Sequence, residues 1–112
     1  MTVQELVDAM GLKVFQMGDP QREIQGGYCG DLLSWVMGRA GADCVWLTIM
    51  TNGNVAAVAS LADVACVLLT EGVEPDPDLM TKAGAHGITL LGCPDGTYEG
   101  AVRVASVLRG QA

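Results

Sequence analysis

The sequence predicts a single α/β domain with a mostly parallel sheet of about four to five strands and flanking helices. From residue 44 onward, apolar runs of strand length alternate with helical segments, which is the order of a parallel sheet with helical crossovers. The chain has 112 residues, enough for one domain and too few for two ordinary ones. We therefore expect residues 1–112 to form one domain.

The composition predicts an aliphatic core. Hydrophobic residues make up 50% of the chain and charged residues 17%, so the chain has enough apolar side chains to fold. Aromatic residues are only 4%, so valine, leucine, isoleucine, alanine and methionine must fill the interior.

The N-terminal segment predicts one helix followed by two short extended pieces. Thr2 and Glu5 have the spacing of a capping box, and Gly11 is placed to end the helix that follows. Residues 12–16 predict a short strand, and residues 22–27 predict a second extended segment.

The middle of the chain predicts the first strand–helix repeat. Asp31 is expected to cap a helix that runs to Arg39. Residues 44–50 form a continuous apolar run, which is typical of a parallel strand buried on both faces. A turn at residues 51–54 then leads into a helix.

The last third predicts two more repeats. Residues 65–70 form the next buried strand, and an acidic, proline-punctuated loop leads to a helix that Gly87 ends. Residues 88–91 form another strand, and Thr97 is expected to cap the final helix.

The charge excludes several classes of partner. Formal net charge is −7, with 13 acidic residues against 6 basic ones, and the basic residues are scattered singly. Nucleic acids and anionic membranes attract clustered basic residues, so neither is expected as a partner. No apolar run approaches the length of a membrane span and the N-terminus lacks signal-peptide features, so a cytoplasmic location is expected.

The four cysteines do not predict a metal or redox centre. No C-x-x-C spacing occurs, and Cys44 and Cys66 lie in apolar segments, where we expect small buried hydrophobes. Cys29 and Cys93 lie near predicted strand ends and keep some scope for reactivity. No cofactor or metal is expected.

The stretch Gly26-Gly27-Tyr28-Cys29-Gly30 raises the question of a phosphate loop. A Walker loop needs a lysine beside the phosphates, and no lysine lies between Lys13 and Lys82. The spacing also lacks the first interval of a dinucleotide fingerprint. We therefore interpret the glycines as a bend or a close approach of backbones.

Other catalytic sets are also missing, so the chain is not expected to be an enzyme. His86 is the only histidine, and no serine lies in a nucleophile-elbow motif. The acids between Glu71 and Asp78 are expected to form a solvated loop.

The carboxyl ends of the predicted strands are polar and almost uncharged, which favours binding over bond cleavage. Ligands of parallel α/β sheets bind beyond these strand ends. The residues expected to contact a small molecule there are Thr51, Asn52, Asn54, Glu71 and Thr97.

Several segments in order resemble the DRTGG domain family. They are Arg22-(x)3-Gly26-Gly27, Gly30-Asp31-Leu32, Leu47-Thr48-Ile49, residues 65–72 and Gly87-Ile88-Thr89-Leu90-Leu91. The resemblance runs over residues 2–108 and implies a fold similar to the N-terminal domain of HPr kinase/phosphorylase, without its kinase domain. One departure is Gln21, where the family name suggests an acid, so Arg22 is expected to be free or to pair with Glu23 or Asp31.

The resemblance implies a regulatory role without catalysis. Its members occur as accessory domains beside CBS domains in some pyrophosphatases and within some phosphotransacetylases. Stand-alone versions occur in anaerobic bacteria, some of them near iron-only hydrogenase genes. A homodimer that senses a nucleotide or metabolite is the implied function.

Three hypotheses follow, in descending order. The first is a regulatory homodimer that binds a small molecule at the strand ends. The second is a protein–protein adaptor without a small ligand, accessory to an anaerobic redox or hydrogenase system. Its interface would contain Tyr28, Trp35, Met37 and Met17. The third is a redox helper that uses Cys29 and Cys93.

Overall fold

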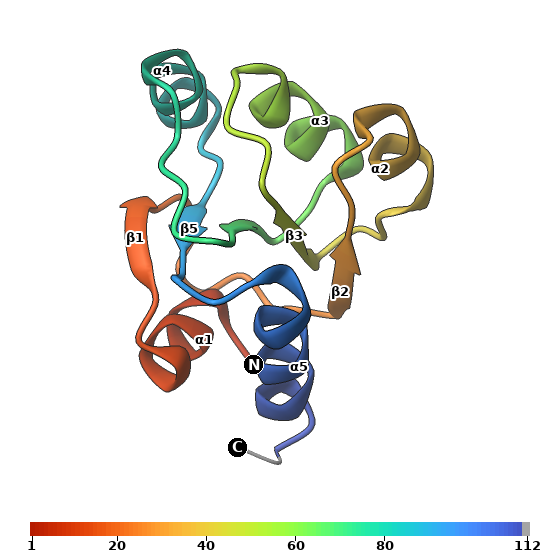
Figure 1. Ribbon diagram of the computed structural model, residues 1–112, viewed down its shortest axis with the longest axis vertical. Coiled ribbons are helices and arrows are strands. Elements are labelled where there is room, and N and C mark those ends of the chain that lie inside the picture. The colour runs from red at the N-terminus through yellow and green to blue at the C-terminus, as the bar shows by residue number, and fades with distance from the viewer. Residues whose placement is uncertain (111–112) are drawn as a thin grey trace.

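The computed structural model describes residues 1–110 and contains a five-stranded sheet with helices on both faces (Figure 1). The strands have the order β1-β5-β4-β3-β2. Their bounds are Lys13–Gln16 for β1, Gly26–Cys29 for β2, Cys44–Thr48 for β3, Cys66–Leu69 for β4 and Leu90–Gly92 for β5. The helices are α1 Val3–Met10, α2 Leu33–Arg39, α3 Asn54–Ala62, α4 Pro77–His86 and α5 Thr97–Leu108.

The path of the chain places the helices on two faces. Strands β2, β3, β4 and β5 are parallel and follow one another across the sheet. Their crossovers therefore all run in one direction, and right-handed connections put α2, α3 and α4 on the same face. Helices α1 and α5 cover the opposite face (Figure 1). The prediction of a mostly parallel α/β sheet is confirmed.

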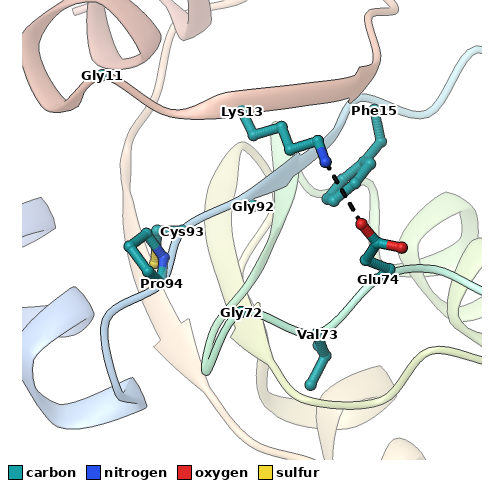
Figure 2. A pocket seen from close by; sticks show the side chains of 9 residues that line it. All are labelled: Gly11, Lys13, Phe15, Gly72, Val73, Glu74, Gly92, Cys93 and Pro94. Atoms are coloured by element: carbon teal, nitrogen blue, oxygen red, sulfur yellow. Dashed lines mark hydrogen bonds and ion pairs between the residues drawn. The ribbon is translucent and has the colours of Figure 1, made fainter.

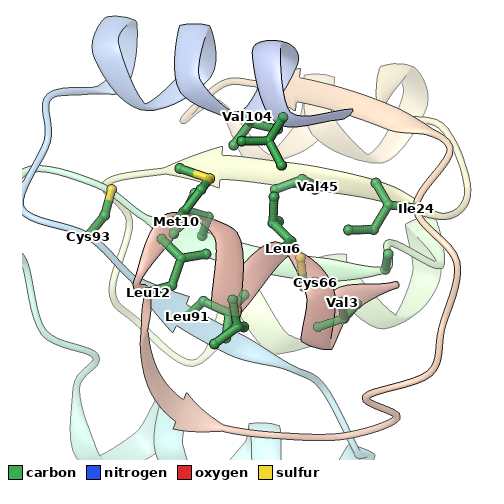
Figure 3. Close-up of a cluster of buried hydrophobic side chains, with 14 of the residues drawn as sticks. Val3, Leu6, Met10, Leu12, Ile24, Val45, Cys66, Leu91, Cys93 and Val104 are labelled. Atoms are coloured by element: carbon green, nitrogen blue, oxygen red, sulfur yellow. The ribbon is translucent and has the colours of Figure 1, made fainter. Parts of the chain in front are cut away.

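Each face of the sheet has its own apolar core. Val3, Leu6 and Met10 of α1 pack with Val104 and Val107 of α5 against one face (Figure 3). The opposite core gathers around the fully buried Trp46 side chain and the buried residues of α3 and α4. Because β3 and β4 are covered on both faces, their side chains are buried throughout, as their apolar runs predicted.

Helix α1 is fixed by the cap that the sequence predicted. The Thr2 hydroxyl accepts from the Glu5 backbone N–H at 3.1 Å, and the Glu5 carboxylate accepts from the Thr2 N–H at 2.9 Å. Gly11 ends the helix in the left-handed conformation, with φ +64°. This turn brings the chain back as β1, which pairs antiparallel with β5 at one edge of the sheet.

Two predicted helix caps are wrong. Leu32, not Asp31, stands at the N-cap of α2. The Asp31 carboxylate instead accepts from the Thr48 hydroxyl at 2.8 Å and from the Ile49 N–H at 3.0 Å, so it ties the end of β2 to the end of β3. Gly96 is the N-cap of α5, and Thr97 is its first helical residue.

Some predicted element bounds also shift. The extended segment predicted at residues 22–27 becomes strand β2 over Gly26–Cys29, and Ile24 before it is buried. Within residues 1–110, no helix is both long enough and apolar enough to cross a membrane.

Candidate functional site

The connections after β4 and β5 leave the sheet toward opposite faces. The chain passes from β4 to α4 on one face, and from β5 to α5 on the other (Figure 1). Neighbouring parallel strands whose connections diverge form a topological switch point, where α/β proteins place their ligand crevices. The geometry of the carboxyl ends of β4 and β5 therefore decides what the domain can bind.

The two diverging loops are joined by backbone and side-chain hydrogen bonds. The Glu71 N–H donates to the Asp95 carbonyl at 2.7 Å, and the Gly72 N–H donates to the Cys93 carbonyl at 3.0 Å. The side-chain hydroxyl oxygens of Thr70 and Thr97 lie 2.7 Å apart and form a hydrogen bond between the same two loops. These bonds join the two loops directly, so a ligand cannot lie between the carboxyl ends of β4 and β5.

An open hollow of about 230 Å³ lies beside these joined loops, toward β1 (Figure 2). We call it the β1–β5 hollow. Its lining comes from β1, from the segment after β4 and from the end of β5. The lining residues are Gly11, Lys13, Phe15, Gly72, Val73, Glu74, Gly92, Cys93 and Pro94.

The β1–β5 hollow combines an apolar surface with one ion pair. The Phe15 ring lies so close to Gly92 that a Cβ atom there would stand 2.5 Å from it. The Lys13 ammonium lies 4.9 Å from the Phe15 ring centroid and 3.5 Å from a Glu74 carboxylate oxygen (Figure 2). Both charged side chains are exposed, so this pair is weak and can exchange for a ligand.

The N-terminus of α5 carries negative charge. The Glu71 carboxylate lies against Gly96, with one oxygen 3.1 Å from the position that a Cβ atom would take. Asp95 just before the helix pairs with Arg103. An acid beside a helix N-terminus is favourable and occupies the place that an anionic ligand would need. Phosphate binding at this helix end is therefore disfavoured.

The other residues predicted to bind a ligand are placed apart from the hollow. Thr51 follows β3, and its carbonyl accepts from the Asp76 N–H at 2.9 Å. The Asn52 side chain accepts from the Asn54 N–H at 2.9 Å and so shapes the turn into α3. Glu71 and Thr97 do come together at the joined loops. The binding role of all five residues remains a prediction.

Three of the predicted interface residues, Tyr28, Trp35 and Met37, lie at the β2 edge, whereas Met17 packs against the core beneath α1 and α5. Trp35 and Met37 are 53% and 48% exposed, so neither is a core residue. Tyr28 is half-buried and packs against the core beneath α2. The Arg39 guanidinium lies 3.9 Å from the centroid of the Trp35 ring.

The cysteine environments disfavour thiolate chemistry. Burial raises the pKa of Cys66 to about 12 and that of Cys44 to about 11. Burial also raises the pKa of Cys93, and desolvation together with the charge of Asp31 raises that of Cys29. A thiol acts as a nucleophile or metal ligand in its thiolate form, and all four remain protonated at neutral pH.

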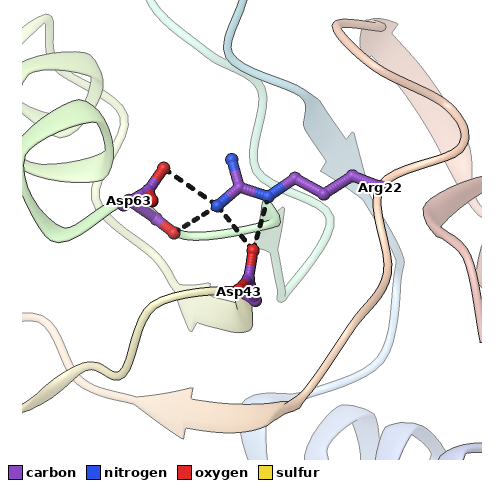
Figure 4. A network of polar contacts seen from close by, with 3 residues as sticks. All are labelled: Arg22, Asp43 and Asp63. Carbon is purple, nitrogen blue, oxygen red and sulfur yellow. Dashed lines mark hydrogen bonds and ion pairs between the residues drawn. The ribbon is translucent and has the colours of Figure 1, made fainter.

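Arg22 holds together the N-terminal ends of two central strands (Figure 4). Its guanidinium donates to the Asp43 carboxylate at 2.9 Å, to the Asp63 carboxylate at 2.9 Å and to the Asp63 carbonyl at 2.6 Å. Asp43 and Asp63 precede β3 and β4, and both have positive φ. The prediction that Arg22 is free or pairs with Glu23 or Asp31 is wrong, because Arg22 pairs with Asp43 and Asp63. Glu23 pairs instead with the N-terminal amine.

The remaining titratable side chains do not converge. Glu74 pairs with Lys13, Asp78 pairs with Lys82, and His86 is exposed at the end of α4. Within residues 1–110, no three His, Cys, Asp or Glu side chains are close enough together to hold a metal ion.

The glycines between residues 26 and 30 differ in whether their surroundings would exclude a side chain. A Cβ atom at Gly30 would lie 3.0 Å from the Tyr28 ring, so close packing accounts for this glycine. At Gly26 a Cβ atom would meet nothing within 4 Å, and at Gly27 it would meet only an ordinary contact of 3.7 Å. Neither has positive φ. The expected bend or close approach within the chain is therefore wrong for these two residues, which lie in the edge strand β2.

Comparison with known proteins gives a match among solved structures. No family model matches the sequence, and no curated protein does. A crystal structure of the CBS and DRTGG domains of the regulatory region of Clostridium perfringens pyrophosphatase, in complex with the activator diadenosine tetraphosphate, superposes with a TM-score of 0.72. The fold is DRTGG-like. The match covers 92% of this chain but 45% of the other chain, at 10% sequence identity, and so concerns the fold.

Lys13, Phe15 and Val73 were not among the predicted site residues. They are brought together because β1 turns back and pairs antiparallel with β5, which puts Lys13 level with Gly92. The sequence signal was indirect. The Gly11 helix stop and the short strand after it were visible, but nothing local showed which strand β1 would join.

Proposed function

We propose that this DRTGG-like domain is a non-catalytic regulatory module that binds a small molecule in the β1–β5 hollow and self-associates as a homodimer. The observation that carries the binding proposal is the hollow itself, which lies beside the switch point, between β1 and the carboxyl ends of β4 and β5. It has the composition of a binding site, with apolar and backbone surfaces and one charged pair.

The size of the hollow limits the ligand class. About 230 Å³ is below the range of roughly 300–1,000 Å³ that is usual for drug-sized ligands. It suits a single planar ring or a small metabolite. The Phe15 ring and the glycine backbones offer flat surfaces for such a ring, and the Lys13 ammonium can pair with a carboxylate or phosphate on it.

The matched pyrophosphatase region supports a nucleotide as the first class to test. That structure holds the activator diadenosine tetraphosphate. A polyphosphate chain finds little positive charge on this chain, whose net charge is −7. We therefore expect an adenine ring with few phosphates, or an acyl phosphate, to bind better than a dinucleoside polyphosphate.

The residues of the β1–β5 hollow allow a paired test of the binding proposal. Glu74→Gln removes the carboxylate that competes for Lys13, so an anionic ligand should bind several-fold more tightly. Lys13→Met removes the cation and should weaken binding of the same ligand by a similar factor. Lys82→Met is the control, because it removes one positive charge from another exposed ion pair.

The first assay is thermal unfolding against adenine nucleotides, dinucleoside polyphosphates and acyl phosphates. A ligand at 100 times its dissociation constant adds about 2.7 kcal/mol to the free energy of unfolding. If no compound raises the midpoint, the ligand proposal fails and the adaptor without a small ligand replaces it. The exposed Trp35 and Met37 would then be the residues to substitute in a search for a protein partner.

A further inference from the structure

The two edges of the sheet differ in how they are protected. Edge strand β1 carries Lys13 and a register irregularity between Val14 and Gln16, both of which discourage pairing with another chain. Edge strand β2 is Gly26-Gly27-Tyr28-Cys29, with no charge, proline or bulge. Alternate backbone groups of such an edge point outward without a partner strand.

The glycines of β2 have no explanation inside one copy of the chain. A glycine in a strand weakens it, and usually marks a bulge, a bend or a close approach of another backbone. Gly26 and Gly27 have neither positive φ nor an atom near the Cβ position that would exclude a side chain. The close approach that would account for them must come from outside.

Apolar side chains flank β2 on both faces of the sheet. On one face, Leu32 and Trp35 at α2 are 59% and 53% exposed. On the other, Tyr98 and Val102 of α5 are 77% and 45% exposed. Two shallow hollows, of about 280 and 150 Å³, follow one another between β2 and α5 and share Ala105. An interface at this edge would cover the two hollows, which β2 residues line.

The charges at this edge are arranged to complement a second copy in the antiparallel direction. Arg109 lines the hollow beside Gly26, and Arg39 lies at the same end, because α2 returns from the end of β2 toward the start of β3. Asp31 lies exposed just beyond the other end of β2. The acids at the first end are already paired, Asp43 and Asp63 with Arg22 and Glu23 with the N-terminal amine. A two-fold axis between two copies of β2 therefore brings the two arginines of each copy toward Asp31 of the other.

We infer that a second copy of this chain pairs its β2 antiparallel with β2, so that the two sheets join into one across a two-fold axis. This rests on the homodimer part of the proposed function and is independent of the β1–β5 hollow, which lies at the opposite edge. Because a two-fold axis keeps each residue on its own face of the sheet, opposed positions must differ by an even number. We place the axis at Tyr28, so that Gly27 lies opposite the partner's Cys29 and Gly26 lies opposite the partner's Gly30.

Because a side chain fits at Gly27 in the single chain, a substitution there tests the interface directly. Gly27→Lys fits the single chain, because its Cβ meets only an ordinary contact, but it places a charge in the interface. Sedimentation over about 20 to about 200 µM should show a wild-type dimer and a dissociation constant raised about a hundredfold or more in Gly27→Lys. Val14→Lys on the β1 edge is the control and should leave the dimer unchanged, and circular dichroism verifies folding of each variant.

Cross-linking tests the register independently. Oxidised Gly27→Cys should form a covalent dimer through Cys29 of the partner subunit, and the additional change Cys29→Ser should abolish it. A wild-type dimer that Gly27→Lys leaves intact would overturn β2 pairing while sparing the homodimer. A monomer at the highest concentration would overturn both, and ligand binding in the hollow would still be tested by the Lys13 and Glu74 variants.

Discussion

The Arg22 guanidinium donates to both the carboxylate and the backbone carbonyl of Asp63, at 2.9 and 2.6 Å. Together with its bond to Asp43, this places one side chain across the starts of β3 and β4. Its own carbonyl accepts from the Val3 N–H at 3.0 Å, so Arg22 also connects α1 to the sheet. Arg22, which lies in the segment that resembles the DRTGG family, is thus a structural clamp at the end of the sheet opposite the candidate site.

Replacing this arginine should destabilise the fold without weakening ligand binding. We expect Arg22→Ala to lower the free energy of unfolding by about 2 kcal/mol, since it removes charge-assisted bonds from a partly buried group. Arg22→Lys should recover only part of this, because an ammonium lacks the planar fork. Lys82→Ala, which breaks an exposed pair, should cost at most about 0.5 kcal/mol in the same urea titration. Equal losses for Arg22→Ala and Lys82→Ala would contradict the clamp.

The Thr70–Thr97 hydrogen bond should couple the two loops energetically. Thr70 is fully buried, so Thr97→Val leaves a hydroxyl without its partner and should cost about 1–2 kcal/mol. Thr70→Val alone should cost a similar amount, and the double variant should cost less than the sum. A double-mutant cycle in urea measures this coupling, and strict additivity would show that the hydroxyl pair contributes nothing.

Gly92 should be required for packing. A Cβ atom there would stand 2.5 Å from the Phe15 ring, so Gly92→Ala forces the ring to move and should cost about 1–3 kcal/mol. Because Phe15 lines the β1–β5 hollow, the same change should also weaken ligand binding. Gly84→Ala on the exposed side of α4 meets only an ordinary contact and should stabilise by about 0.5–1 kcal/mol. Thermal unfolding of the two variants should therefore shift in opposite directions.

The buried thiols should make the fold sensitive to alkaline pH. Burial raises the pKa of Cys66 from 9.0 to about 12, so below pH 9 both the folded and the unfolded states keep the proton. Above pH 9 the unfolded state loses it while the folded state retains it, and the free energy of unfolding falls by up to about 1.4 kcal/mol per pH unit. Cys66→Ala should reduce this slope between pH 9 and 11 more than Cys29→Ala does. Identical slopes for Cys66→Ala and Cys29→Ala would contradict the Cys66 thiol as the source of the pH dependence.

The fold was largely predictable from the sequence because strong local signals agreed. The apolar runs of β3 and β4 and the capping box at Thr2 and Glu5 are local signals, and all lie where expected. The cap at Asp31 failed because a tertiary bond to Thr48 competes with the helix for the same carboxylate.

The candidate site was less predictable because it depends on pairing between distant segments. Its position at the carboxyl ends of the strands followed from a general rule, but the hollow depends on β1 joining β5. Lys13 and Phe15 are far in sequence from Val73 and Glu74, and no spacing links them. For the same reason, the partners of Arg22 could not be chosen before Asp43 and Asp63 were placed.

The most direct test of the ligand proposal is a nitrogen–proton correlation spectrum recorded with adenine nucleotides and acyl phosphates. The β1–β5 hollow is lined by the backbone of Gly11, Gly72 and Gly92, whose amide signals report on it without any substitution. We predict that one compound class shifts these three signals together and leaves Asn52 and Asn54 unchanged. Shifts confined to the turn after β3, or no shifts with any compound, would contradict the hollow as the binding site.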